Sequence, residues 1–313
     1  MPRTADLHID AALTNIASAY GVNKEFVAPQ IAPYVQVSKD TGKYFVMGYE
    51  ELQIFDDVIT DKTEAKEVDW FATTASYATV GRALKTFVSD KSVAVADAAV
   101  DPLATTVRKL TSMLNLNREA RQSAAFVTAT TSYTTAIGDA WATASTGTPL
   151  TNIRTAIETV YARSGVYANT LLLPRTLVPT VIATAEYRDY VKYVQPANEQ
   201  LNAEIAPNLC GLKVVLTSAQ KSSDDLKSTL FQGTKPTTTG VWLSDSAYVC
   251  YVNPQPSVTD ASFMYHLGLT PFRVRRWRDE KRGIGGGTWI QVEYEGVDKV
   301  INALLVHELD NVI

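Results

Sequence analysis

The sequence predicts an α+β fold in which a body of helices and strands carries an extended N-terminal region. Three observations lead to this fold class. The N-terminal third holds apolar segments without the periodicity that would close a local core. One long amphipathic helix is expected at about residues 101–126. After a Thr/Ala/Ser-rich stretch at 127–148, short helical and strand patterns alternate, and long alternating strands close the chain.

Length and composition limit the class of protein. The 313 residues exceed one typical domain and could form two intimately joined ones. Hydrophobic residues make up 46% and charged residues 20% of the chain, and the formal net charge is −4. This composition supplies ample apolar material for a core. The charged fraction is slightly below the usual quarter, which suggests that other protein covers part of the surface.

Cysteine usage and hydropathy indicate a soluble protein that is intracellular when made. Cys210 and Cys250 cannot form a disulfide framework and lack metal-site spacing, so two free buried thiols are expected. The first twelve residues carry charges and no apolar core, unlike a signal peptide. No stretch reaches the roughly 18 consecutive apolar residues that a membrane span needs.

The first extended region is an apolar arm. Residues 6–20 have a short amphipathic helix pattern, and the segment from Phe26 to Pro33 follows it. Its two prolines favour extended backbone before each of them. Apolar side chains such as Phe26 and Ile31 have no local partner in this pattern. Such a segment lies on another part of the protein or on a neighbouring molecule.

The second extended region is an acidic ribbon, which we define as residues 50–71. Residues 34–37 and 43–47, which include Tyr44 and Phe45, alternate as strands around a turn at 39–42. Between residues 50 and 69 there are eight acidic side chains, including Asp56 and Asp57, against two lysines. Alternation around Ile54 and Trp70 predicts a long hairpin with a polar tip. A two-stranded ribbon is marginal alone in water, so it needs a docking surface.

The helix at 101–126 has clear start signals and one buried side. Asp101 can cap it, and Pro102 suits the first turn. Its apolar stripe continues through Ala120 and Ala124 after Leu103, Val107, Leu110 and Leu114. The remainder of the helix surface holds Arg108, Lys109, Arg118 and Arg121.

The second half of the chain reads as a module of about a hundred residues followed by returning strands. Helices are expected from Thr151 to Gly165, over 177–193 and over 223–231, and strands over 169–173, 212–216, 241–243 and 247–252. Strands at 272–278 and 289–295 flank a glycine-rich loop at 283–287, and a third strand covers 300–307.

No pattern of catalytic, metal-binding or cofactor-binding residues is present. The glycine loop lacks the Gly-Lys-Ser/Thr ending of a phosphate-binding loop, so a flexible hairpin tip is the favoured interpretation. His8, His266 and His307 lie near no cysteine or carboxylate at ligand spacing. No Gly-x-Ser-x-Gly elbow occurs. We therefore expect no enzyme, no metal and no cofactor.

A basic strand remains to be explained, because residues 273–282 contain six cations against two acids. With Trp277 it could bind nucleic acid, since arginines contact phosphates and an aromatic ring stacks on a base. However, the chain is acidic overall, and strand alternation places the arginines on both faces. An interface or salt-bridge role is favoured over direct DNA contact.

The order of these elements resembles the major capsid proteins of tailed bacteriophages, which share the Hong Kong 97-type capsid fold. The residues from Ile31 to Val37 and from Thr41 to Phe45 look like the segment by which these proteins lead from the arm into the extended loop. The glycine-rich hairpin and the final run from Ala303 to Val306 are similar to their C-terminal strands. The resemblance covers the whole chain by element order and carries no highly specific motif.

The resemblance implies five regions and a function. It implies an N-arm at 1–40, an extended loop at 41–85, a peripheral domain at 86–149 with its spine helix, an axial domain at 150–262, and peripheral return strands at 263–313. The implied protein is a shell subunit that forms pentamers and hexamers around double-stranded DNA in a virion and is assembled in the host cytoplasm. A separate scaffolding protein, a portal and a decoration protein are implied partners, with no sequence-specific DNA contact and no membrane.

A shell subunit must bury apolar surface against copies of itself. We expect arm and ribbon to drape over neighbours, which removes apolar area from water at about 25 cal/mol per Å². The acidic ribbon of one copy is expected to dock on basic peripheral surface of the next. The candidate interface residues are Phe26, Ile31, Tyr44, Phe45, Ile54, Asp56, Asp57, Trp70, Arg108, Arg118, Arg273, Arg275, Arg276 and Arg278.

Two other functions stay open. An encapsulin-like bacterial compartment would use the same fold to hold an enzyme cargo. A soluble α/β enzyme would explain the middle module, although no catalytic constellation supports it.

Overall fold

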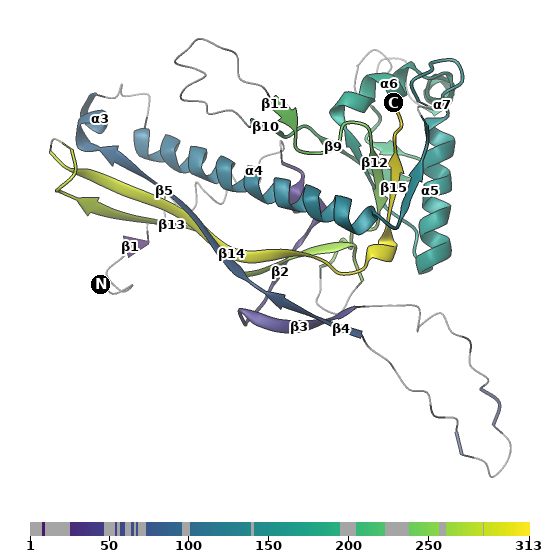
Figure 1. Ribbon diagram of the computed structural model, residues 1–313, viewed down its shortest axis with the longest axis horizontal. Coiled ribbons are helices and arrows are strands. Elements are labelled where there is room, and N and C mark those ends of the chain that lie inside the picture. Colours follow the sequence, from purple (N-terminus) through teal and green to yellow (C-terminus); the bar gives the residue numbers. More distant parts are fainter. Residues whose placement is uncertain are drawn as a thin grey trace.

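The computed structural model describes residues 8–9, 26–46, 54, 57–59, 64–65, 67, 73–95, 101–138, 141–194, 205–222, 238–256, 261–283 and 285–313. Figure 1 shows two bodies joined by the long helix α4 (Pro102–Thr130). One body is a five-stranded sheet that α4 crosses lengthwise. The other is a six-stranded sheet at the far end of α4.

The five-stranded sheet is built on a long hairpin. Strands β13 (Met264–Asp279) and β14 (Gly287–Val300) pair antiparallel, and β5 (Val80–Ser89) pairs with β14. The two-residue strand β1 (His8–Ile9) and the parallel strand β2 (Tyr34–Gln36) add to β13. Alternate strand residues of this sheet pack against the apolar side of α4. The core between them consists of Val88, Val107, Leu110, Leu114, Val274, Ile290, Val292 and Tyr294. This hairpin confirms the two returning strands around the glycine loop and extends both.

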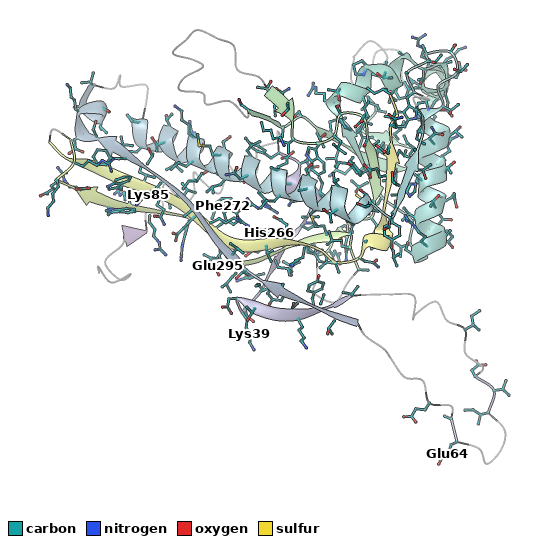
Figure 2. All side chains as sticks on the ribbon, in the orientation of Figure 1. Lys39, Glu64, Lys85, His266, Phe272 and Glu295 are labelled. Atoms are coloured by element: carbon teal, nitrogen blue, oxygen red, sulfur yellow. The ribbon has the colours of Figure 1, made fainter. Side chains whose placement is uncertain are left out.

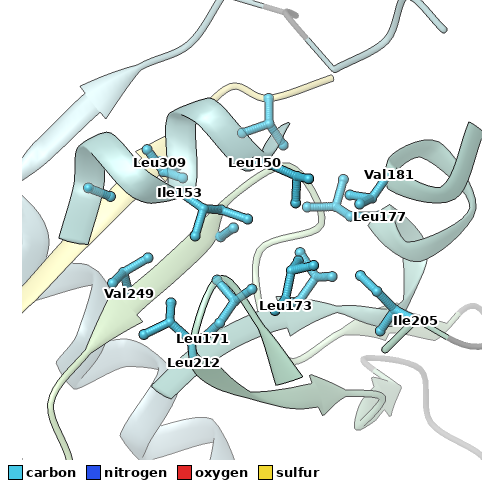
Figure 3. Close-up of a cluster of buried hydrophobic side chains, with 14 of the residues drawn as sticks. Leu150, Ile153, Leu171, Leu173, Leu177, Val181, Ile205, Leu212, Val249 and Leu309 are labelled. Carbon is cyan, nitrogen blue, oxygen red and sulfur yellow. The ribbon is translucent and has the colours of Figure 1, made fainter. Parts of the chain in front are cut away.

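The six-stranded sheet is covered on both faces. Its order is β6 (Thr134–Ala136), β15 (Val306–Asp310), β12 (Ala247–Cys250), β7 (Thr170–Pro174), β9 (Leu212–Thr217) and β8 (Asn208–Leu209). Helices α5 (Pro149–Ser164), α6 (Val178–Ala183) and α7 (Ala185–Val194) cover one face, and Figure 3 shows the aliphatic core beneath them. The other face packs on Phe126 of α4 and on the arm.

The last strand differs from its predicted place. The sequence suggested a third peripheral strand over 300–307, but β14 ends at Val300 and a 3₁₀ turn, η4 (Ala303–Leu305), follows. Strand β15 then pairs antiparallel with β12 and parallel with β6. Residues 306–310 thus belong to the sheet of the implied axial domain. Strand alternation shows that a segment is a strand but not which sheet it joins.

The helix signals marked the start of one helix and the end of another, and they missed a break inside a third. Asp101 accepts hydrogen bonds from the N–H groups of Leu103 and Ala104, which confirms the cap of α4. Helix α5 starts at Pro149, two residues before the expected cap, and ends as expected at Gly165 in a left-handed conformation with φ of 69°. The helix expected over 177–193 is broken at Thr184, after η3 (Arg175–Leu177) and α6. The helix expected over 223–231 lies outside the described residues.

The extended regions also pair differently from the expected order. Strand β3 (Thr41–Val46) pairs with β4 (Thr73–Ala78), whereas β2 pairs with β13. Residues 80–85, which the resemblance assigned to the extended loop, belong to β5 and pair with β14 in the five-stranded sheet. His8–Ile9 is a strand and not part of a helix; the rest of the 6–20 helix lies outside the described residues. Strands β10 (Gln220–Ser222) and β11 (Thr238–Gly240) form a separate pair, and α3 (Asp90–Val95) follows β5.

Two glycines face each other where the long hairpin meets the arm. Gly268 and Gly296 are partners across β13 and β14. A Cβ on Gly268 would lie 2.2 Å from the Tyr34 ring, and one on Gly296 would lie 2.7 Å from His266 Nε2. The two rings therefore occupy space that side chains at these positions would fill. Register shifts in β13 between Gly268 and Arg273 mark a bulge beside this point.

Candidate assembly surfaces

Four candidate interface residues lie inside the chain's own core. Phe26 and Tyr44 are 8% exposed, Arg118 is 7% exposed and Ile31 is fully buried. The expectation that Phe26 and Ile31 need a neighbouring subunit for burial is wrong. Ile31 packs between α4, the six-stranded sheet and β13, and Phe26 is also buried within the chain. Contacts between segments far apart in the sequence bury Ile31, and periodicity cannot show them.

Arg118 is also not on the solvated side of α4. Its guanidinium donates to the Ala32 carbonyl oxygen at 3.2 Å and pairs with Asp298 at 3.4 Å. The next residue, Glu119, accepts from the Val27 N–H at 3.1 Å and from the Trp242 indole N–H at 2.8 Å. Helical spacing already indicated that Arg118 is buried, because it lies four residues after Leu114 and so on the same apolar stripe of the helix. A charge on a buried stripe predicts a buried network.

The buried network has a defined charge state. Burial raises the pKa of Asp298, but the interactions with His266, Arg118 and Gln122 together outweigh burial and lower it to about 2. Burial lowers the pKa of His266, because a neutral ring is easier to bury. Burial raises the pKa of Glu119, although its hydrogen-bond donors and the charge of Arg118 oppose this effect. At neutral pH, an ionised Asp298 thus accepts from a neutral His266 and from Gln122.

The basic strand is largely neutralised within the chain. Arg273 and Arg275 both bind the Glu293 carboxylate, the latter at 2.8 Å. Arg278 pairs with Asp90 at 3.0 Å and lies 3.8 Å from Glu280. Arg276 is exposed and has a partner as well. The favoured salt-bridge role of this strand therefore agrees with the geometry for these residues.

A group of rings and cations at the end of the hairpin is the more open feature. We call Lys85, Phe87, Trp277, Arg282 and Trp289 the aromatic–cation platform. The two indoles stack at 6.2 Å and 17°, and Phe87 lies 5.4 Å from Trp289. Lys85 Nζ is 5.0 Å from the Trp289 ring, and the Arg282 guanidinium is 4.8 Å from it. Both cations are exposed, and neither has a salt bridge within the described residues.

Sequence reasoning identified only part of this platform. Trp277 and the basic run were noted, whereas Lys85 and Phe87 come from β5, about two hundred residues earlier in the chain. The register that pairs Phe87 with Trp289, and Trp289 with Trp277, brings the three rings together. Pairing between strands that are distant in the sequence forms the platform, and no local motif predicts it.

The described ribbon residues are solvent-exposed. Ile54 is 100%, Val58 71% and Ile59 59% exposed, and Asp57 is exposed as well. Asp56, Trp70 and the side chain of Phe45 lie outside the described residues, and Arg108 is exposed on α4. Figure 2 places Glu64 at one end of the molecule and Lys85 near the opposite end. Within one molecule, the ribbon at Glu64 therefore lies far from Lys85 of the aromatic–cation platform.

The described residues offer little support for catalysis. They contain no group of three or more His, Cys, Asp or Glu side chains that could hold a metal ion. A hollow of about 290 Å³ is lined by Arg175, Thr217 and Trp242, among others, without a nucleophile–base pair. His307 Nε2 lies 3.0 Å from the Thr135 hydroxyl, a hydrogen-bond distance, and no nucleophile is paired with it there. None of the helices in the described ranges combines the length and apolarity that a bilayer crossing requires.

Solved structures resemble this chain over almost its full length, whereas no protein-family model and no curated sequence matches it. A phage-related protein from Bordetella bronchiseptica RB50 has a TM-score of 0.70 at 18% identity, with 98% of each chain covered. The capsid structure of cyanophage P-SCSP1u gives 0.61 at 11% identity and covers 90% of this chain and 86% of that one. A virus-like particle from Pyrococcus furiosus gives 0.53 at 10% identity and covers 96% and 98%.

These matches confirm the predicted fold. Arm, loop, spine helix and two sheet-based bodies occur in the same chain, and phage capsid structures superpose on it. The chain has the Hong Kong 97-type capsid fold.

Proposed function

We propose that this chain is the major capsid protein of a tailed bacteriophage, a shell subunit and not an enzyme. The observation that carries the proposal is the likeness to particle structures over most of the chain: the virus-like particle protein covers 96% of it and the cyanophage capsid structure covers 90%. In the proposed setting the protein is part of the virion and encloses double-stranded DNA.

The proposed self-association is head to tail. The described acids of the ribbon, Asp57, Glu64 and Glu67, are exposed, and Glu64 lies at the opposite end of the molecule from the exposed Lys85 of the platform. Complementary patches that differ from each other make heterologous contacts, which close into rings when the rotation permits. Pentamers and hexamers are such rings. The carboxylates of one ribbon would meet Lys85 and Arg282 of the next copy, and Val58 and Ile59 would lie on the rings.

The earlier choice of docking residues changes accordingly. Arg273, Arg275 and Arg278 already have carboxylate partners, so a ribbon that bound them would have to displace Glu293 or Asp90. Exposed Lys85 makes no salt bridge among the described residues, and Arg282 interacts electrostatically with Asp279 without forming one. Complementary charge of this kind steers association and register more than it raises affinity. A scaffolding protein, a portal and a decoration protein remain proposed partners on the strength of the fold.

Electron microscopy of purified protein tests the proposal. Icosahedral particles, or capsomers of five and six copies, are expected, together with nuclease-resistant double-stranded DNA in particles from infected or induced cells. Particles that hold a co-purifying enzyme and no DNA would instead identify the compartment alternative. A monomer at all concentrations, with or without scaffold, would overturn both.

A further inference from the structure

The arm segment, residues 26–33, lies between the two bodies of the subunit. Val27, Ile31 and Ala32 belong to the same core cluster as Phe126 of α4 and Leu172 of β7. On the other side, the His266 N–H donates to the Pro33 carbonyl oxygen at 2.9 Å, and β2 continues along β13. The segment therefore touches the helix, the six-stranded sheet and the five-stranded sheet.

Two adjacent residues of α4 hold the arm, and each also holds one of the two bodies. Glu119 binds the Val27 N–H through one carboxylate oxygen and the Trp242 indole N–H, on the side of the six-stranded sheet, through the other. Arg118 binds the Ala32 carbonyl oxygen and Asp298 of β14 in the five-stranded sheet. Both side chains are nine-tenths or more buried.

We infer that Arg118 and Glu119 are positioning residues that clamp the arm onto its own subunit and fix the orientation of the two bodies. Each copy thus enters assembly with residues 26–33 already seated on its own subunit. The seating of the arm on its own subunit does not depend on the proposed function. The consequence for shells rests on the proposed function.

Residue chemistry makes the clamp testable with small changes. A carboxylate accepts through both oxygens, whereas an amide accepts through only one and presents donors at the other position. Glu119→Gln thus places an NH₂ group against either Val27 or Trp242. A lysine ammonium cannot reproduce the fork with which Arg118 reaches Ala32 and Asp298. Both substitutions keep the size of the side chain close to the original.

The experiment is hydrogen exchange of unassembled subunits, followed by mass spectrometry of peptides. In Glu119→Gln and Arg118→Lys, peptides within 26–37 should exchange at least about tenfold faster, while peptides covering β7 keep their protection. Thr111→Val is the matched control, because Thr111 is buried on the same helix and donates only to the Val107 carbonyl oxygen. It should leave the arm protected.

Assembly supplies the second readout. Subunits with a loosened arm should form shells of mixed diameter or incomplete shells, whereas wild-type and Thr111→Val subunits form uniform ones. Shells that stay uniform although the arm exchanges faster would overturn the role in orientation.

Two results in the subunits themselves would overturn the clamp. Unchanged exchange at 26–37 in both variants would remove it. Equal loss of protection in the arm and in β7 would show that the pair supports the whole fold. Neither result depends on shell formation, so a failure of the proposed function is distinguishable.

Discussion

The arm and the ribbon look alike in sequence but differ in the folded chain. Both carry apolar side chains without local periodicity, and the sequence predicts both to be extended. In the structure the arm is not extended throughout, because residues 28–31 form the short helix α2 (Ala28–Ile31), with Pro29 in its first turn. The arm residue Ile31 is fully buried, and the ribbon residue Ile54 is fully exposed. Among the described residues, the arm has backbone and side-chain partners within the chain. The comparison separates two uses of apolar segments that have no local partner: one completes the subunit, and the other stays available to a second copy.

The largest expected difference comes from one substitution made in both regions. Ile31→Ala should lower the free energy of unfolding of isolated subunits by about 2–5 kcal/mol, because it leaves a cavity in a packed core. Ile54→Ala should change it by less than about 0.5 kcal/mol. Chemical denaturation of unassembled protein measures both. Similar values at the two sites would remove the distinction.

Acid should weaken the subunit through its buried histidines. Burial lowers the pKa of His307 from 6.5 to about 4, with Arg163 adding to the effect. The unfolded chain thus takes up a proton more readily than the folded one. The stability that the neutral ring contributes is complete above pH 6.5 and declines as pH falls towards 4. Thermal unfolding of unassembled subunits between pH 8 and about 4 should follow this direction.

Two histidine variants locate the effect. His307→Gln should reduce the pH dependence over that window. His266→Gln should reduce the pH dependence of hydrogen exchange in peptides of the arm. Burial also lowers the pKa of His266, which interacts with Asp298, Arg118 and Arg121. The ribbon contains no histidine, so this response has no counterpart there. An unchanged pH profile in both variants would contradict the assignment.

The cap of helix α4 should have a smaller effect on the free energy of unfolding. Asp101→Ala removes the acceptor of two N–H groups at the start of α4 and should cost about 1 kcal/mol. Asp101→Asn should restore most of it, because asparagine is an equally good cap. Equilibrium unfolding in urea compares the three proteins. Equal stabilities would mean that the cap is unimportant.

The smallest effect on the isolated subunit is expected at the ribbon and the platform. Glu64→Lys and Lys85→Glu should each change subunit stability by no more than about 0.5 kcal/mol. Each should nevertheless slow assembly in light scattering, and the defect should weaken as salt screens the charges. The double variant should recover part of the loss. If these charge changes leave assembly unaffected, the ribbon does not dock on the platform.

Local features were predictable from the sequence, and distant pairings were not. Asp101, Pro102 and Gly165 marked helix ends through backbone chemistry that acts over a few residues. Strand β15 was assigned to the wrong body because its partner β12 lies more than fifty residues away. The arm was misjudged for the same reason.

The candidate site divides along the same line. Trp277 could be noted from a local run of cations, but Lys85 and Phe87 join it only through strand register. Arg118 and Glu119 were detectable in principle, as charges on the side of the helix that also carries Leu114 and Phe126. Their partners, Val27, Trp242 and Asp298, are set by tertiary structure alone.

The facing glycines of the long hairpin have a consequence for how such chains diverge. Tyr34 and His266 fill the room that Gly268 and Gly296 leave open. A substitution at either glycine is tolerated only when the opposing ring becomes smaller or moves. Across evolutionary time these positions should therefore change in pairs, Gly268 with Tyr34 and Gly296 with His266, while neighbouring strand positions drift independently.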